Sequence, residues 1–417
     1  MTPLNISFDP RDTPGIIVAK MWVRDGSRAD PTSQKGVHQL LGSLLTRGCG
    51  PYDHIQVSDL VEGCGAGLRC DTYEDGLLIS LKCNDKDCLK LFSIMGWMIA
   101  EPHIEKDQLS LEKSLTIQNI KRQRESPFFI AFNEWRKLVY GNGPYGHDSL
   151  GIIEDIKKIH RREVANIGDL FTQKKKFLVI SGQLPTGLKE SLSHLEPFNS
   201  MILQTKSIDI ENRVIKRINE NQTLDSIVLK REETSQVILI LGKMTIPHSH
   251  VDDIALRLLS CHLGSGMSSV LFKKLREDRG MAYEVGVYFP IRELESPFFI
   301  HASTTIDKSL ITLDILKECW NTFLSQPMTT KEINLARAKF RGNIAHNSQS
   351  IAQRAERKVH LQGLKMNECH DKEMLKKIDS ISSKEILEAA RKHLQSPCLS
   401  LCGPSEAITK LERIGLN

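Results

Sequence analysis

Hydrophobic and polar positions follow the same order twice along the chain. GIIVAKMWV at 15–23 and QVILILGKM at 236–244 are short apolar runs rich in β-branched residues, and each predicts a strand. An amphipathic helical pattern follows each strand, and further strand and helix patterns recur at an offset of about 220 residues. The paired segments are 15–23 with 236–244, 36–47 with 251–263, 66–70 with 282–289, 76–83 with 297–304, 87–102 with 308–327, and 153–182 with 375–404. The pattern indicates a duplicated domain.

The recurring order predicts an α+β fold, because the strand pairs at short spacing favour antiparallel sheets with helices packed on one face. We place one domain at 1–205, a charged linker without an apolar stripe at 206–222, and a second domain at 223–417. One identical hexapeptide, ESPFFI, occurs at 125–130 and 295–300. The first copy leads into a helical pattern and the second lies in a strand-like run, so we interpret this repeat as chance.

Composition narrows the function classes without naming one. The 417 residues are 40% hydrophobic and 26% charged, which is enough to fill two cores, and the net charge of +5 requires no nucleic acid or anionic membrane as a partner. No apolar run reaches the length of a membrane span, and the N-terminus lacks the pattern of a signal peptide. The ten cysteines are too sparse for a disulfide scaffold. We therefore expect a soluble protein in a reducing compartment, the cytoplasm.

The predicted helix at 36–47, GVHQLLGSLLTR, carries an apolar stripe on one side and polar or small residues on the other. Here the chain resembles the inverted-zincin peptidases, which include pitrilysin, insulin-degrading enzyme and the mitochondrial processing peptidase. In that family the helix carries His-x-x-Glu-His, whose histidines bind zinc and whose glutamate activates the metal-bound water. The flanking Gly36 and Arg47-Gly48 set the register, which puts Gln39 and Ser43 at the ligand positions and Gly42 at the glutamate position.

The third ligand of the family is a glutamate on a later helix, seven residues after another glutamate. In this chain Glu112 is kept, whereas the ligand position holds Asn119. Amide and hydroxyl groups are poor zinc ligands, and glycine cannot take up a proton. The resemblance therefore implies that Gln39, Gly42, Ser43 and Asn119 are degenerate positions, and that the chain has no catalytic residue, metal or cofactor of its own.

The second half departs less from the family. LGSGMSSVLFKKLREDRGMAYEVGVYF at 263–289 is similar to the family's C-terminal signature at nearly every marked position. The resemblance implies that Arg276 and Tyr283, seven residues apart, bind substrate. Arginine offers planar donors to a peptide carbonyl, and a phenol can donate to an oxyanion. The family resemblance covers essentially the whole chain and implies the processing-peptidase fold in both domains.

Other candidate sites have simpler interpretations. Cys64, Cys70, Cys83 and Cys88 lack the paired spacing of a metal knuckle and are expected to pack as small hydrophobes. The segment Pro247-His248-Ser249-His250 could chelate a metal through two histidines, but it is also typical of the turn before a helix. We favour the turn.

Two functions from different classes remain. The first is a non-catalytic, substrate-binding subunit of a heterodimeric zinc peptidase, in which a partner of the same family supplies the zinc and the substrate is an extended peptide. The alternative is a structural or peptide-holding paralogue without a catalytic partner. Retention of Arg276 and Tyr283 favours the first, because a scaffold has no need of that pair.

Overall fold

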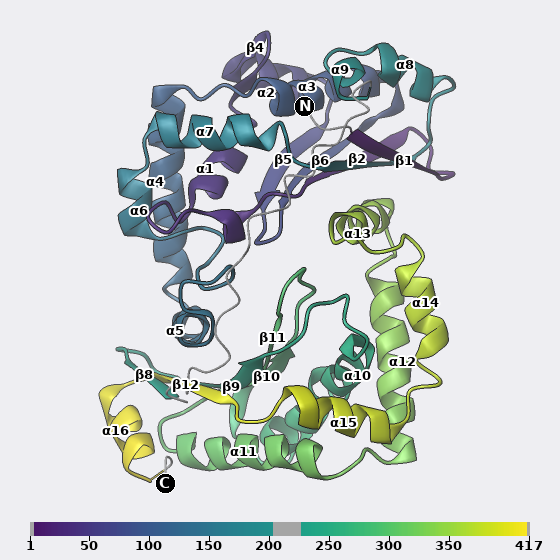
Figure 1. Ribbon diagram of the computed structural model, residues 1–417. Coiled ribbons are helices and arrows are strands. Elements are labelled where there is room, and N and C mark those ends of the chain that lie inside the picture. The colour runs from purple at the N-terminus through teal and green to yellow at the C-terminus, as the bar shows by residue number, and fades with distance from the viewer. Residues whose placement is uncertain (1–3, 203–226, 415–417) are drawn as a thin grey trace. The chain divides into compact units, whose positions relative to one another are not determined.

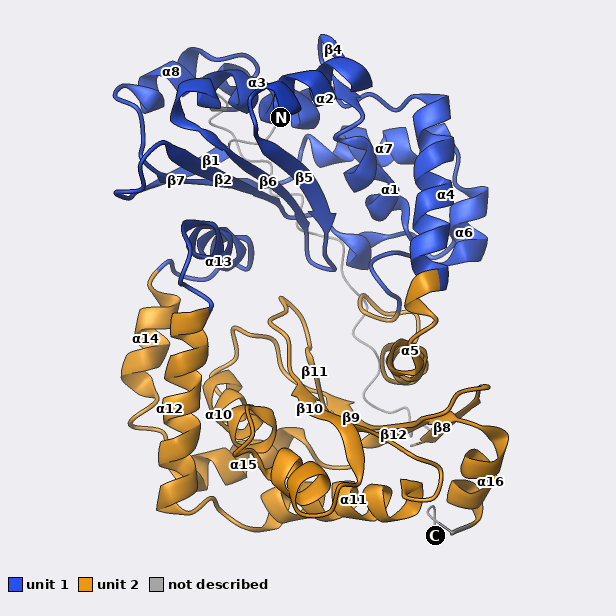
Figure 2. Ribbon diagram, turned by 180° about the vertical axis from the view of Figure 1, so that it is seen from behind, with its two compact units in different colours: residues 1–121, 147–216, 347–368 blue, residues 122–146, 217–346, 369–417 orange. Residues whose placement is uncertain are grey.

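The protein folds into two compact units, each built around a five-stranded sheet (Figure 1). The computed structural model describes residues 4–202 and 227–414, so the predicted linker at 206–222 lies outside the described residues. Unit 1 comprises residues 1–121, 147–216 and 347–368, and unit 2 comprises 122–146, 217–346 and 369–417 (Figure 2). The units therefore differ from the two halves of the chain by exchanging one segment each.

The sheet of unit 1 has the strand order β1-β7-β2-β6-β5. Its strands are β1 (Leu4–Pro10), β2 (Ile16–Val23), β5 (Gly67–Thr72), β6 (Leu77–Asn84) and β7 (Lys176–Gly182). The helices of the unit are α1 (Val37–Leu44), α2 (His54–Gly63), α3 (Cys88–Ala100), α4 (Lys106–Gln123, whose last two residues fall in unit 2), α6 (Ile153–Lys158), α7 (Arg161–Phe171), α8 (Leu188–His194), α9 (Phe198–Ile202) and α13 (Ile351–Gly363). A short hairpin, β3 (Gly48–Cys49) with β4 (Tyr52–Asp53), follows α1.

Unit 2 repeats this plan with the order β10-β11-β9-β12-β8. Its strands are β8 (Ile227–Arg231), β9 (Val237–Met244), β10 (Ala282–Tyr288), β11 (Pro297–Thr304) and β12 (Cys398–Gly403). Its helices are α5 (Pro127–Tyr140), α10 (Asp253–Gly264), a π-helix (Phe272–Glu277), α11 (Ser309–Ser325), α12 (Thr330–His346), α14 (His370–Lys377), α15 (Ser383–His393) and α16 (Ser405–Ile414). The predicted α+β fold of two similar domains is confirmed.

Each sheet is mixed rather than purely antiparallel. The predicted strands pair antiparallel, as in β2 with β6 and β9 with β11, but β1 pairs with β7 and β8 pairs with β12 in parallel. These parallel partners come from the beginning and the end of each half of the chain. A long connection lies between the partners, as a parallel pair requires.

Both faces of each sheet are covered, which corrects the expectation of helices on one face. In β2, Ile17, Ala19 and Met21 belong to the main core of unit 1, whereas Val18 and Trp22 pack on the opposite face with Ala355 and Val359 of α13. In β9, Ile238 and Ile240 likewise pack with α5. The two helices occupy equivalent places in the repeat, since each follows the long polar helix, α4 or α12. Each sheet is thus completed by a helix from the other half of the chain.

Candidate functional site

Helix α1, which the resemblance marks as the degenerate zinc helix, begins on a buried carboxylate. Asp30 accepts hydrogen bonds from the backbone N–H groups of Gly36 at 2.6 Å and His38 at 3.2 Å. Gly36 has a left-handed φ of 107°, which favours glycine, and a Cβ there would lie 3.0 Å from the carbonyl oxygen of Leu150. A side chain from outside the helix therefore satisfies the N–H groups that a helix N-terminus leaves unpaired.

The same carboxylate holds two buried histidines. Asp30 Oδ1 lies 2.6 Å from His38 Nδ1, and Asp30 Oδ2 lies 3.1 Å from His147 Nε2. His38 Nε2 faces Asp25 Oδ2 at 3.4 Å, and Asp25 in turn pairs with Lys174 at 3.1 Å. All but Lys174 are almost fully buried. The result is a closed network of charged groups at the start of α1.

Burial disfavours the charged imidazole of His38 and acts to lower its pKa. The hydrogen bonds to Asp25 and Asp30, together with the negative charges of these two carboxylates, have the larger effect and raise the pKa of His38 to about 9. Burial also acts against ionisation of Asp30, yet its two histidine partners lower its pKa to about 2. The pair is therefore an imidazolium and a carboxylate at neutral pH. Sequence reasoning missed this network, because Asp30 and His147 are 117 residues apart and no motif links them.

The degenerate positions on α1 do not fit a zinc ion. The hydroxyl of Ser43 donates to the carbonyl oxygens of its own helix at Gln39 and Leu40, both at 3.1 Å. Gly42 is buried, and a Cβ on it would lie 2.6 Å from Thr72 Oγ1 and 3.2 Å from Leu77 Cδ2. The space beside the glutamate position is thus occupied by β5 and β6. The donors needed for zinc are missing and their surroundings have been repacked.

The fourth degenerate position lies on α4. Asn119 is exposed there, whereas Glu112, one of the family residues that this chain keeps, is buried. Arg47, just after α1, binds Glu112 Oε1 through Nε at 2.8 Å and Nη2 at 2.7 Å. Two donors on one buried carboxylate form a strong charge-assisted contact. The contact ties α4 to the residue that follows α1, and these are the two helices on which the resemblance places the zinc ligands.

The predicted substrate-binding residues Arg276 and Tyr283 lie together in unit 2. Arg276 is exposed on the π-helix, and its Nη1 donates to the carbonyl oxygen of Tyr283 at 3.2 Å. Its guanidinium also lies over the ring of Phe272, 5.2 Å from the centroid. Gly280, in the turn between them, has a left-handed φ of 54° that lets the chain reverse into β10. The spacing of seven residues therefore spans a helix, a tight turn and the start of a strand.

Tyr283 is 61% exposed, which is unusual for an aromatic side chain in a sheet. It lies at a β-bulge, because Ala282 pairs with Thr304 and Glu284 with Ser303, leaving Tyr283 without an opposite residue. A β-bulge changes the direction in which a side chain points, and such bulges are frequent beside active sites. β10 is also an edge strand of its sheet. The guanidinium is therefore held by a backbone carbonyl, and both the phenol and the guanidinium are exposed to solvent.

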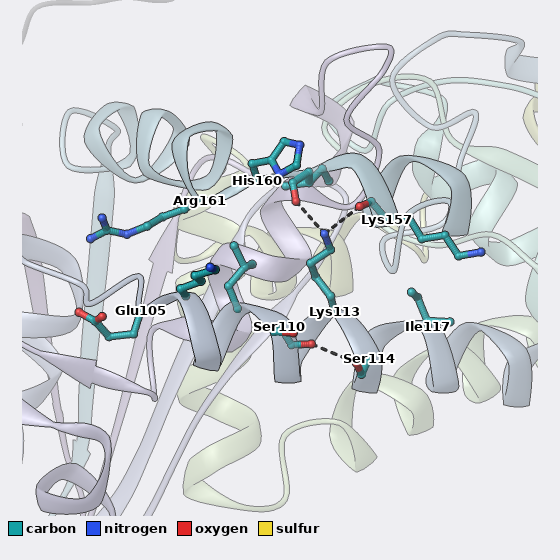
Figure 3. Close-up of a pocket in the computed structure, with 11 residues that line it drawn as sticks. Glu105, Ser110, Lys113, Ser114, Ile117, Lys157, His160 and Arg161 are labelled. Atoms are coloured by element: carbon teal, nitrogen blue, oxygen red, sulfur yellow. Dashed lines mark hydrogen bonds between the residues drawn. The ribbon is translucent and has the colours of Figure 1, made fainter.

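A separate cavity of 680 Å³ lies among α4, α6 and α7 (Figure 3). Its lining contains five basic side chains, from Lys106, Lys113, Lys157, His160 and Arg161, and one acid, Glu105. Lys113 donates to the backbone carbonyls of Lys157 and Ile159, each at 2.9 Å, and burial lowers its pKa. Arg161 donates to the carbonyl of Ile104 at 2.6 Å. Two of the basic groups thus hold α4 against its neighbours, which indicates a structural junction.

The predicted cysteine packing is confirmed for Cys83 and Cys88, which are buried, whereas Cys64 and Cys70 are partly exposed. Burial raises the pKa of Cys83 to about 12 and also raises that of Cys88. None of the four belongs to a cluster with metal-binding geometry among the described residues. Over the same residues, no helix is long and apolar enough to cross a membrane.

Two sequence profiles of one peptidase family match the chain. The profile of insulinase (peptidase family M16) matches residues 13–149, which include α1 and Glu112, and the profile of the peptidase M16 inactive domain matches residues 182–340, which include Arg276 and Tyr283. The chain belongs to the insulinase family, M16. Within it, the altered zinc positions make it a degenerate member.

Relatives in this family carry mixed names. A Bacillus subtilis protein named an uncharacterized zinc protease, YmxG, is 21% identical over 85% of this chain and 84% of its own. A Helicobacter pylori protein named a non-peptidase homolog, YmxG, is 21% identical over 89% of this chain and 85% of its own. The second name agrees with a non-catalytic M16 protein.

Solved structures show the same fold. The peptidase M16 inactive domain from Pseudomonas fluorescens superposes with a TM-score of 0.82 at 21% identity, covering 96% of this chain and 95% of its own. A protease from Helicobacter pylori gives a TM-score of 0.83 at 15% identity, covering 97% of this chain and 98% of its own. At these identities the likeness establishes the fold, and function has to be argued from the residues.

Proposed function

We propose that this M16 chain is the non-catalytic, substrate-binding subunit of a heterodimeric zinc peptidase. The observation that carries the proposal is a contrast within one chain. The Ser43 hydroxyl is bonded within its own helix and Gly42 is closed in by Thr72, whereas Arg276 and Tyr283 are exposed. An exposed aromatic ring stabilises no core, so its retention on an edge strand favours binding.

Arg276 and Tyr283 have the chemistry to hold an extended peptide. The bond from Arg276 Nη1 to the carbonyl of Tyr283 fixes the guanidinium plane, and its other N–H groups can donate to a substrate carbonyl. The phenol can donate to an oxygen on which negative charge develops during cleavage. In this proposal a partner of the same family supplies the zinc and the water-activating glutamate, while this chain binds and orients the peptide.

Co-purification tests the proposal directly. The tagged chain is isolated from native cells, and proteins bound to it are identified by sequencing. We expect a partner of similar size that carries His-x-x-Glu-His, and cleavage of an unfolded peptide by the pair but by neither chain alone. Added zinc should give the isolated chain no activity, because the Gly42 position offers no base. A peptidase activity intrinsic to the isolated chain would refute the proposal, and an inactive complex would favour the scaffold function instead.

A further inference from the structure

A cluster of two imidazoles and one carboxylate lies in unit 2, outside the site described above. His250 and Asp252 precede α10, and His393 is the last residue of α15. One potential ligand atom from each residue lies within 4.8 Å of those of the other two. Among the described residues, no other group of three or more His, Cys, Asp or Glu side chains has this geometry. All three side chains are partly buried.

We infer that His250, Asp252 and His393 form a binding site for a divalent transition-metal ion of the zinc class. Two imidazoles and one carboxylate are a ligand set typical of such ions, and a water molecule completes the coordination. Asp252 Oδ2 lies 2.7 Å from His393 Nε2 and 3.7 Å from His250 Nδ1. Ligands ~2.0–2.1 Å from a tetrahedral ion are roughly 3.3 Å apart. The two observed separations bracket that value, and the ligand atoms of His250 and His393 lie within 4.8 Å of each other, so the three side chains have to draw closer together to hold the ion.

The metal has to displace contacts that the side chains make without it. His393 loses its hydrogen bond to Asp252. His250 Nδ1 loses the hydrogen bond of 3.0 Å that it accepts from the backbone N–H of Asp252. Lys392 Nζ, 3.1 Å from the same carboxylate oxygen, also has to move away. Its side chain is 62% exposed, so the ammonium can return to water at little cost. The ion then bonds the three ligand atoms in place of the hydrogen bonds that those atoms lose.

The turn favoured from the sequence is present, because residues 248–252 form a turn before α10. The alternative, chelation by His248 and His250, is not what the structure offers, because His248 is buried and lies 2.8 Å from Asp253 Oδ2 and 3.1 Å from Arg257 Nη2. His250 is joined instead by His393, 143 positions later in the chain, whose ring lies edge-on at 5.2 Å. A metal here would link the beginning of α10 to the end of α15. It involves neither α1 nor the Arg276–Tyr283 pair, and so it is independent of the proposed function.

Titration of the full-length, metal-stripped chain with Co²⁺ and Zn²⁺ tests the inference. We expect one ion per chain with a Kd of about 10 µM or tighter. The Co²⁺ complex should show weak visible bands without thiolate charge-transfer absorption. His393→Gln and Asp252→Asn should each weaken binding about tenfold or more. His346→Gln, which changes an exposed histidine outside the cluster, should leave binding unchanged.

Circular dichroism confirms that each variant is folded before titration. The inference is overturned if the wild-type chain binds no Co²⁺ at 100 µM, roughly ten times the expected Kd. It is overturned equally if His393→Gln and His346→Gln bind the ion alike. A thiolate absorption band that persists in both variants assigns the metal to a cysteine site and overturns the inference as well.

Discussion

The Nδ1 atom of His38 lies 2.6 Å from Oδ1 of Asp30 in the interior of unit 1. Asp30 also accepts hydrogen bonds from the backbone N–H groups of Gly36 and His38. One carboxylate therefore pairs with the imidazole of His38 and also holds the start of α1. In the family this helix carries the catalytic zinc. In this chain a buried network of protein charges stabilises the start of α1.

Stability should fall between about pH 6.5 and pH 9. The pKa of His38 is raised from 6.5 to about 9, so its contribution is fully present below pH 6.5 and is lost as pH rises through 9. A shift of this size corresponds to at most roughly 3 kcal/mol. The pKa of Asp30 is lowered from 3.8 to about 2, so its contribution to stability is present above pH 3.8 and is lost as the pH falls through 2. Chemical denaturation at a series of pH values measures both.

The His38→Gln variant is the control for this pH dependence. It should be less stable than wild type at pH 6, because Asp25 and Asp30 lose a cationic partner. Its stability should change less than that of wild type between pH 6.5 and 9. Parallel curves for the two proteins would show that other groups cause the alkaline loss.

Gly42→Ala should destabilise the protein although alanine is the better helix former. The new Cβ would lie 2.6 Å from Thr72 Oγ1, and overpacking of this kind costs about 1–3 kcal/mol. The higher helix propensity of alanine stabilises the folded state by about 1 kcal/mol at most. We therefore expect a net loss of up to about 2 kcal/mol in the free energy of unfolding.

A double-mutant cycle with Thr72→Ala isolates the contact. If the clash with Thr72 causes the destabilisation, Gly42→Ala should lower the free energy of unfolding by less in the Thr72→Ala background. We expect a coupling energy of about 0.5–2 kcal/mol. Additive effects, together with a negligible cost of Gly42→Ala alone, would show that the helix accommodates a side chain at position 42.

Trp135 should be the main anchor of α5 on the sheet of unit 2. Its ring is fully buried, packs against Phe299 at 5.2 Å, and donates from Nε1 to the carbonyl of Cys398 at 3.3 Å. Trp135→Ala should therefore cost about 3–5 kcal/mol. Phe129→Ala, on the same helix but 37% exposed, is the matched control and should cost less than about 1 kcal/mol. Equal losses in urea unfolding would mean that α5 is not anchored through this face.

The strands could be predicted closely because their apolar pattern is local. The predicted strand at 297–304 has the same bounds as β11, and 15–23 differs from β2 by one residue. β1 and β8 were missed, since both are edge strands with mostly half-buried residues and no clear alternation. The hexapeptide ESPFFI leads into α5 at its first copy and enters β11 at its second. Its role is therefore set by context.

The sequence of β2 contains a pattern that indicates burial of both sheet faces. β2 reads IIVAKMWV, with apolar residues at even as well as odd positions, which is typical of a strand buried on both sides. The Arg276–Tyr283 contact followed from the family signature. Asp30, His147 and His393 could not be predicted, because only the tertiary fold brings them to their partners.

Arg276 and Tyr283 can be tested by kinetics in the proposed heterodimer, once it is reconstituted. Tyr283→Phe should lower kcat with little change in KM, because the phenol acts mainly when charge develops on the substrate oxygen. Loss of one such donor typically costs about 10²–10³ in rate. Arg276→Ala should lower kcat and raise KM, since it also removes a contact to the bound peptide backbone. Steady-state kinetics of each variant complex measure both parameters.

Arg279→Ala is the matched control, because this exposed arginine lies three residues after Arg276, in the turn that follows the π-helix. It should leave both parameters near wild type. Gel filtration should show every variant complex intact, because two side chains are a small part of an interface between subunits of this size. Full activity of Tyr283→Phe and Arg276→Ala in intact complexes would make the pair structural. In that case the bulge at Tyr283 has no catalytic purpose, and the scaffold function would replace the proposed one.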